Sequence, residues 1–151
     1  MGVAMFYHLT RSTAQQTLAF ILPRALAQGW RVMLRGTDAA ALERLDALLW
    51  QGADDSFLPH GMAGGDHDAD QPILMGSGAI ANAAQGLVLI DGADTTPDES
   101  LPLERLWALF DGADDTAVAN ARALWTKLTA AGMSAQYWSE DAGKWEKKAE
   151  K

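Results

Sequence analysis

The stretch Leu49–Gly61, which reads LWQGADDSFLPHG, decides how the rest of the chain is organised. It begins at the end of a predicted helix with Trp50 and turns through glycine and aspartate. Pro59 fixes its own φ angle and pushes the residue before it towards extended geometry. We therefore expect Phe57 and Leu58 to lie on a short, rigid, extended segment. Large apolar side chains outside a regular element need cover, which either the edge of the core or a partner protein could supply.

The composition is that of one ordinary globular domain. The chain has 151 residues, is 48% hydrophobic and contains six tryptophans, which is enough to bury a core. The formal net charge of −8 argues against strong direct binding to nucleic acid, because such binding depends on lysine and arginine neutralising phosphates. No cysteine is present, and the segment Met1–Leu9 lacks the basic and apolar regions of a leader. These features predict a cytoplasmic protein without disulfides or thiolate chemistry.

Short apolar runs alternate with helical patterns along most of the chain. Predicted strands cover residues 4–9, 30–34, 73–75, 87–90 and 133–138, while 103–110 suits either a strand or a helix. Predicted helices begin after caps at residues 12–13, 37–38 and 114–115, and end near Gly29, Trp50 and Gly132. Pro23, inside the first pattern, must kink the helix or begin a second one.

This alternation predicts an α/β fold in which a mostly parallel sheet is flanked by helices in three layers. Its topology is expected to be Rossmann-like but without a nucleotide motif, since Gly76-Ser77-Gly78 is not followed by the lysine and hydroxyl of a phosphate loop. We expect a single domain over residues 1–138 and a charged, flexible tail over residues 139–151.

Two histidines invite a chemical reading. His60 has no cysteine, serine or carboxylate at a known catalytic spacing, which favours a structural role. His67 lies in the glycine-rich, acidic segment Gly64–Asp70. The spacing there matches neither a calcium loop nor a zinc helix, and this favours a solvated loop over a metal site. We predict no metal and no cofactor.

In the last predicted helix, Arg122 and Trp125 lie three residues apart, and hence on one side of the helix. A guanidinium beside an aromatic wall suits a peptide that carries both negative charge and an apolar end. From these residues alone, the alternative remains open that Trp125 belongs to the core and Arg122 is solvated.

Several motifs taken together resemble the chi subunit family of bacterial DNA polymerase III. They are Trp50 followed by the run Asp55–His60, and, in the same order as in the family, Phe6–Leu9, Gly29–Val32, Gln71–Ile73, Phe110–Gly112 and Arg122–Gly132. The resemblance favours a strand over residues 103–110. It also implies a docking site for the psi subunit, or for the clamp loader directly, at Trp50, Phe57, Leu58 and Pro59.

The resemblance further implies that the last helix binds the acidic C-terminal tail of single-stranded DNA-binding protein through Arg122 and Trp125. Relatives often carry additional basic residues where this chain has Leu124 and Thr126. Lys127 lies one position after Thr126, and hence about 100° further around the helix. It is therefore expected to replace these basic residues only in part.

With this resemblance, the sequence predicts a noncatalytic accessory subunit of the replicase. It would tether the clamp loader to single-stranded DNA that is coated with single-stranded DNA-binding protein. Two other classes remain as alternatives. One is a nucleotide-binding or hydrolytic enzyme on a similar scaffold, using Gly76-Ser77-Gly78 or the His67 loop. The other is a purely structural interaction domain, in which Arg122 has no role.

Overall fold

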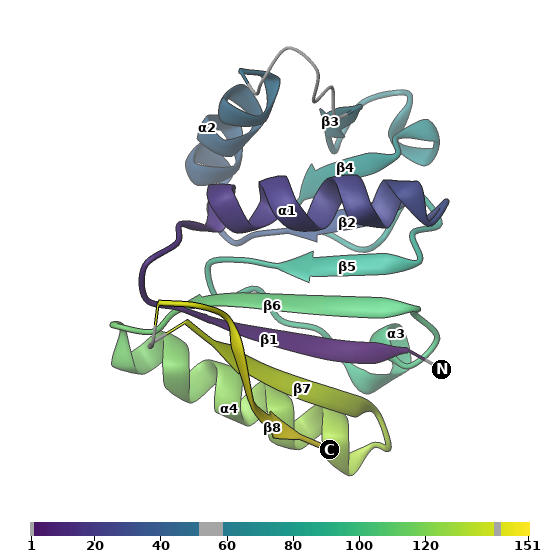
Figure 1. The fold of residues 1–151 in the computed structure, drawn as a ribbon. Coiled ribbons are helices and arrows are strands. Elements are labelled where there is room, and N and C mark those ends of the chain that lie inside the picture. The colour runs from purple at the N-terminus through teal and green to yellow at the C-terminus, as the bar shows by residue number, and fades with distance from the viewer. Residues whose placement is uncertain (1, 52–58, 141–142) are drawn as a thin grey trace.

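The computed structural model describes residues 2–51, 59–140 and 143–151. One sheet of eight strands, in the order β3-β4-β2-β5-β6-β1-β7-β8, organises these residues. All neighbouring strands pair in parallel except β7 and β8, as Figure 1 shows. The elements in chain order are β1 Val3–Leu9, α1 Ala14–Ala27, β2 Val32–Arg35, α2 Ala39–Trp50, β3 His60–Met62, the 3₁₀ turn η1 Asp68–Asp70, β4 Ile73–Gly76, β5 Gly86–Leu89, α3 Pro97–Ser100, β6 Arg105–Asp111, α4 Asp115–Ala130, β7 Ser134–Ser139 and β8 Glu146–Glu150. The predicted fold class, a mostly parallel α/β sheet flanked by helices, is confirmed.

Two apolar layers cover the two faces of the sheet. Side chains of α1 and α2, such as Leu22 and Leu45, pack against one set of strand residues. Residues of α4, such as Leu128, pack against the alternate set, which includes Phe6. Because successive strand residues point to opposite faces, both faces must be apolar, and this explains the nearly continuous hydrophobic runs of the central strands.

The helix ends follow the predicted capping chemistry. Thr13 caps α1 in a reciprocal capping box with Gln16, and Asp38 and Asp114 cap α2 and α4 through their side chains. Gly132, which follows α4, has φ of +96°, a conformation that glycine adopts without steric cost. The strand over residues 105–111 agrees with the expectation for 103–110.

The first helix continues through Pro23 as a single element, so this proline does not begin a second helix. Pro23 lies on the exposed side of α1. Water can therefore hydrate the carbonyl that loses its amide partner, and the packed side of the helix stays intact.

The C-terminal segment differs from the expectation of a flexible tail. Glu146–Glu150 forms β8, which pairs antiparallel with β7, and Trp145 packs edge-on to Tyr7 with 5.2 Å between ring centroids. Ala149 is the only apolar residue of β8, so the sequence has no alternating pattern that would predict a strand here. Backbone pairing with β7 at the sheet edge stabilises the strand instead. Strand β3 and helix α3 also lie where only connecting segments were predicted.

Among the described residues, no helix has both the length and the apolar character needed to cross a bilayer.

Candidate functional site

The exposed side of α4 carries the predicted pair Arg122 and Trp125. Val118, Arg122 and Trp125 follow one another at spacings of four and three residues, and so share one stripe of the helix. Arg122 is exposed, whereas Val118 and Trp125 are half-buried. Within the described parts of the chain, no side-chain hydrogen bond or ion pair engages the Arg122 guanidinium. This stripe therefore offers a free positive charge between two partly accessible apolar groups.

Trp125 belongs to the core on one side. Its ring lies edge-on to Phe6 at 5.3 Å and to Tyr137 at 6.3 Å between centroids. Tyr137 in turn makes a 2.7 Å hydrogen bond with the His8 ring. These contacts hold the indole in one orientation. The two interpretations of Trp125 are thus compatible, because packing on one side fixes the wall that the other side can present.

The residues around this stripe divide between the two sides of α4. Leu124 is 7% exposed and packs in the core, so this position points away from Arg122. Thr126 is exposed and donates its hydroxyl to the Arg122 carbonyl at 3.1 Å. Lys127 makes a 2.9 Å ion pair with Asp94 of the loop after β5. Lys127 is five positions after Arg122, which corresponds to about 140° around the helix. The structure does not bring Lys127 together with Arg122 and Trp125.

The second predicted site falls mainly outside the described residues. Trp50 is the last residue of α2, and Pro59 is half-buried just before β3. Phe57 and Leu58 lie in the part of the chain that the structure does not describe. Docking at these positions stays a prediction.

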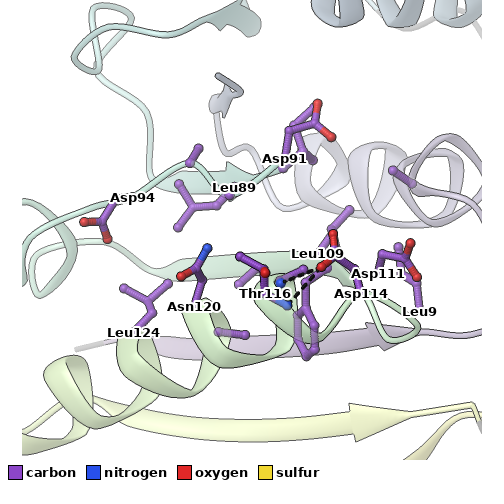
Figure 2. Close-up of a pocket in the computed structure, with 18 of the residues that line it drawn as sticks. Leu9, Leu89, Asp91, Asp94, Leu109, Asp111, Asp114, Thr116, Asn120 and Leu124 are labelled. Carbon is purple, nitrogen blue, oxygen red and sulfur yellow. Dashed lines mark hydrogen bonds between the residues drawn. The ribbon is translucent and has the colours of Figure 1, made fainter. Parts of the chain in front are cut away.

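A cleft of about 980 Å³ opens at the carboxyl ends of the parallel strands. Its walls come from the segments that follow β1, β5 and β6 and from one side of α4 (Figure 2). The chain leaves β1 through α1 on one face of the sheet and leaves β6 through α4 on the other face. In α/β sheets, ligands bind where neighbouring connections diverge in this way. The cleft is thus the structural equivalent of a ligand crevice.

The charges that line this cleft are mainly negative. Asp91 and Asp94 lie on the wall after β5, Asp111 is the last residue of β6, and Asp114 caps α4. Burial raises the pKa of Asp94, but hydrogen bonds from Lys127 and the Thr95 backbone outweigh it and lower the pKa below its usual value. Asp94 therefore remains ionised at neutral pH, and a lining rich in aspartate disfavours a phosphate ligand.

The loop after β1, where related architectures hold phosphate, is already occupied by a carboxylate of this chain. Glu140 accepts hydrogen bonds from the backbone amides of Thr10, Arg11 and Ser12 at 3.0, 2.7 and 2.6 Å, and from the Ser12 hydroxyl at 2.8 Å. Its side chain is nearly buried, with 5% of the residue exposed. Burial raises the pKa of Glu140. The hydrogen bonds from Ser12 and Arg11 lower it by more than burial raises it, so the pKa lies below its ordinary value.

The Gly76-Ser77-Gly78 segment contacts a buried arginine instead of forming an anion cradle. Arg35, 8% exposed, donates from Nε to the Gly78 carbonyl at 3.0 Å and from Nη1 to the Asp94 carbonyl at 2.9 Å. Its guanidinium forms a two-pronged pair with Glu99 at 2.6 and 2.8 Å. This network fixes the loop that carries the Asp91 and Asp94 wall. It gives no support to the nucleotide-binding alternative at this segment.

The two histidines occupy different environments. His60 is buried, and its Nε2 lies 3.1 Å from Asp46 Oδ1, an arrangement that ties β3 to α2. His67 is exposed, with Nδ1 3.9 Å from Asp70 Oδ2. Over residues 2–51, 59–140 and 143–151, no group of three or more histidine and acidic side chains is placed to hold a metal ion.

Neither the acidic cleft nor the Glu140 contact was predictable from the sequence. Glu140 lies 128 to 130 residues from its partners in the β1–α1 loop, and no local pattern signals a contact of that range. The cleft likewise depends on strand order, which brings the residues after β5 and β6 together only in the folded chain.

The fold is a doubly wound, Rossmann-like α/β sheet in which a carboxylate of the chain itself occupies the phosphate position after β1. Residues 1–136 match the family described as DNA polymerase III chi subunit, HolC. The chain belongs to this family. It is also similar to the DNA polymerase III subunit chi of Pseudomonas aeruginosa, with 33% identity over 67 residues, which cover 44% of this chain and 46% of that relative. The match thus spans slightly less than half of the relative's length.

Proposed function

We propose that this protein is a noncatalytic accessory subunit of the DNA polymerase III holoenzyme that acts in DNA replication. It links the clamp loader to single-stranded DNA-binding protein by holding the acidic C-terminal tail of that protein at Arg122 and Trp125. The observation that carries this proposal is an exposed guanidinium, without a partner among the described residues, on the same helical stripe as an aromatic ring held in place by the core. Family membership supplies the setting in replication.

The stripe suits the two features of such a tail. A carboxylate receives charge-assisted hydrogen bonds from the Arg122 guanidinium, and a terminal apolar side chain packs against Val118 and Trp125. After Asp115, no acidic residue follows in α4, so nothing on this helix competes for the guanidinium. Lys127 adds only general positive charge, because Asp94 already pairs with it.

Replacing Arg122 with alanine is expected to weaken tail binding about tenfold or more, because the tail loses its only charge-assisted partner on the stripe. The measurement is fluorescence anisotropy of a labelled peptide that copies the tail, titrated with wild-type protein and Arg122→Ala. Binding by the wild type should weaken as salt is raised.

The matched control is Arg44→Ala, which removes the same charge from an exposed position on α2 and should leave the affinity unchanged. Lys127→Ala should reduce it less than Arg122→Ala. Equal binding by wild type and Arg122→Ala would remove tail recognition from this stripe.

The second contact in the proposal is the dock at Trp50, Phe57, Leu58 and Pro59, which meets the psi subunit or the clamp loader. Aromatic side chains such as those of Trp50 and Phe57 are enriched at protein–protein interfaces, and tryptophan is enriched among the residues that dominate binding energy. Two moderate contacts on one rigid domain raise the local concentration of the polymerase at the coated template without any bond being made or broken.

The double variant Trp50→Ala/Phe57→Ala is expected to lose co-purification with the clamp loader while it keeps tail-peptide binding. Arg122→Ala should show the converse. Thermal unfolding of both variants verifies that the domain is folded. Retention of the clamp loader by the folded double variant would show that the dock lies elsewhere.

A further inference from the structure

The acidic cleft lies on the opposite side of α4 from the Arg122 stripe, and tail binding does not use it. We propose that this cleft is a second interaction site, which takes a basic peptide segment with an apolar side chain from a partner protein. The inference is independent of the tail site, because the two faces carry opposite charge.

Electrostatics select a cationic occupant. Asp91, Asp94, Asp111 and Asp114 line the cleft, and the cation that lines it with them, Lys127, is already paired with Asp94. The N-terminus of α4, which would otherwise attract anions, is capped by Asp114 through the amides of Thr116 and Ala117 at 2.9 and 3.2 Å. Neither Lys127 nor the N-terminus of α4 is therefore free to hold an anion.

Shape and lining favour a peptide over a small ion. Within the described chain, the acids are not placed to hold a metal ion together. Their charges therefore suit a ligand that extends along the cleft. Apolar side chains, among them Leu89, Leu109 and Leu124 with several alanines, line the cleft together with polar ones such as Thr116 and Asn120 (Figure 2). The volume of about 980 Å³ lies at the upper end of the range for ligand sites. Lysine or arginine at the rim and one aliphatic side chain on the floor would complement both features.

The walls are held in place before any ligand arrives. Arg35 fixes the Asp94 carbonyl, and Asp111 accepts a 2.9 Å hydrogen bond from the Ala113 amide. A preorganised groove loses little conformational entropy on binding, which favours affinity for a short segment.

The test uses fluorescein-labelled peptides in anisotropy titrations with the full chain at low salt. The probe alternates lysine and leucine; a second peptide alternates lysine and serine, and a third alternates glutamate and leucine. We expect saturable binding of the lysine–leucine peptide, at least fivefold weaker binding of lysine–serine because the floor contact is lost, and no binding of glutamate–leucine.

The variant Asp91→Asn/Asp111→Asn should weaken the lysine–leucine peptide about fivefold. At position 91, asparagine tolerates the positive φ of 53°. At position 111, its side-chain oxygen can still accept the hydrogen bond from the Ala113 amide. Asn120→Trp, which fills the cleft from an exposed position on α4, should weaken binding of this peptide as much without a change of charge. The control Glu43→Gln/Asp66→Asn makes the same charge change at exposed positions outside the cleft and should have no effect.

Arg122→Ala should leave this binding intact, which separates the outcome from that of the tail experiment. The proposal is overturned if the control acids matter as much as the cleft acids, or if Asn120→Trp has no effect. It is also overturned if the lysine–serine peptide or spermidine binds as tightly as the lysine–leucine peptide, since the site would then recognise charge alone.

Discussion

Replacement of Glu140 with alanine is expected to lower the free energy of unfolding by about 3 kcal/mol, because it leaves three backbone amides and a hydroxyl without their acceptor. Glu140 receives these bonds from the loop between β1 and α1, so the loss falls on the connection between this loop and the segment that follows β7. For a chain of this size the melting temperature should fall by roughly 6–12 °C. Chemical and thermal unfolding followed by circular dichroism measure both quantities.

The pH dependence distinguishes the charge of Glu140 from its packing. Its pKa in the folded protein is below the ordinary value of 4.5, so its stabilisation is present above that value and disappears as the pH falls through the folded pKa. The stability difference between wild type and Glu140→Gln should therefore be largest near neutrality and shrink as the pH falls below 4.5,. Glu43→Ala, which removes an exposed acid from α2, serves as the control. A difference that does not vary with pH would mean that the carboxylate charge is irrelevant to the loop.

Removal of Glu99 is the second substitution with a large expected effect. Glu99→Ala leaves the Arg35 guanidinium, buried between the loops after β4 and β5, without its carboxylate. Breaking one side of such a pair costs about 2–4 kcal/mol, because the remaining charge is poorly solvated. We expect a lower urea midpoint and a looser Asp91 and Asp94 wall, visible as faster amide exchange in that loop.

A double-mutant cycle with Arg35→Met and Glu99→Ala tests this explanation. Loss of both charges should cost less than the sum of the single substitutions, because the double variant has no stranded charge. The exposed pair between Lys127 and Asp94 provides the contrast, since Lys127→Met should cost less than about 1 kcal/mol. Additive effects at Arg35 and Glu99 would show that the two side chains stabilise the fold independently.

Local physics made much of the architecture predictable. Side-chain caps at Thr13, Asp38 and Asp114 mark helix starts because each hydroxyl or carboxylate accepts from the first free amides,. Short aliphatic runs marked the central strands because both faces of a covered parallel sheet are buried. Neither β3 nor β8 had such a signal, since a short strand and a charged edge strand depend on pairing with a neighbour.

For the candidate sites too, helical spacing was predictable from the sequence, whereas burial was not. Arg122 and Trp125 were placed on one side of α4 by helical spacing alone, and the structure agrees. The same spacing says nothing about which side faces the core, and only packing shows that Leu124 is interior and that Lys127 faces Asp94.

The sequence by itself determined the alternation of strands and helices, the family and the charge of the chain, because these depend on residue types and short spacings. The tertiary structure alone decided strand order, the acidic cleft and the occupation of the β1–α1 loop by Glu140. Those features join residues that are far apart along the chain, and the contacts that create them form only when the sheet assembles.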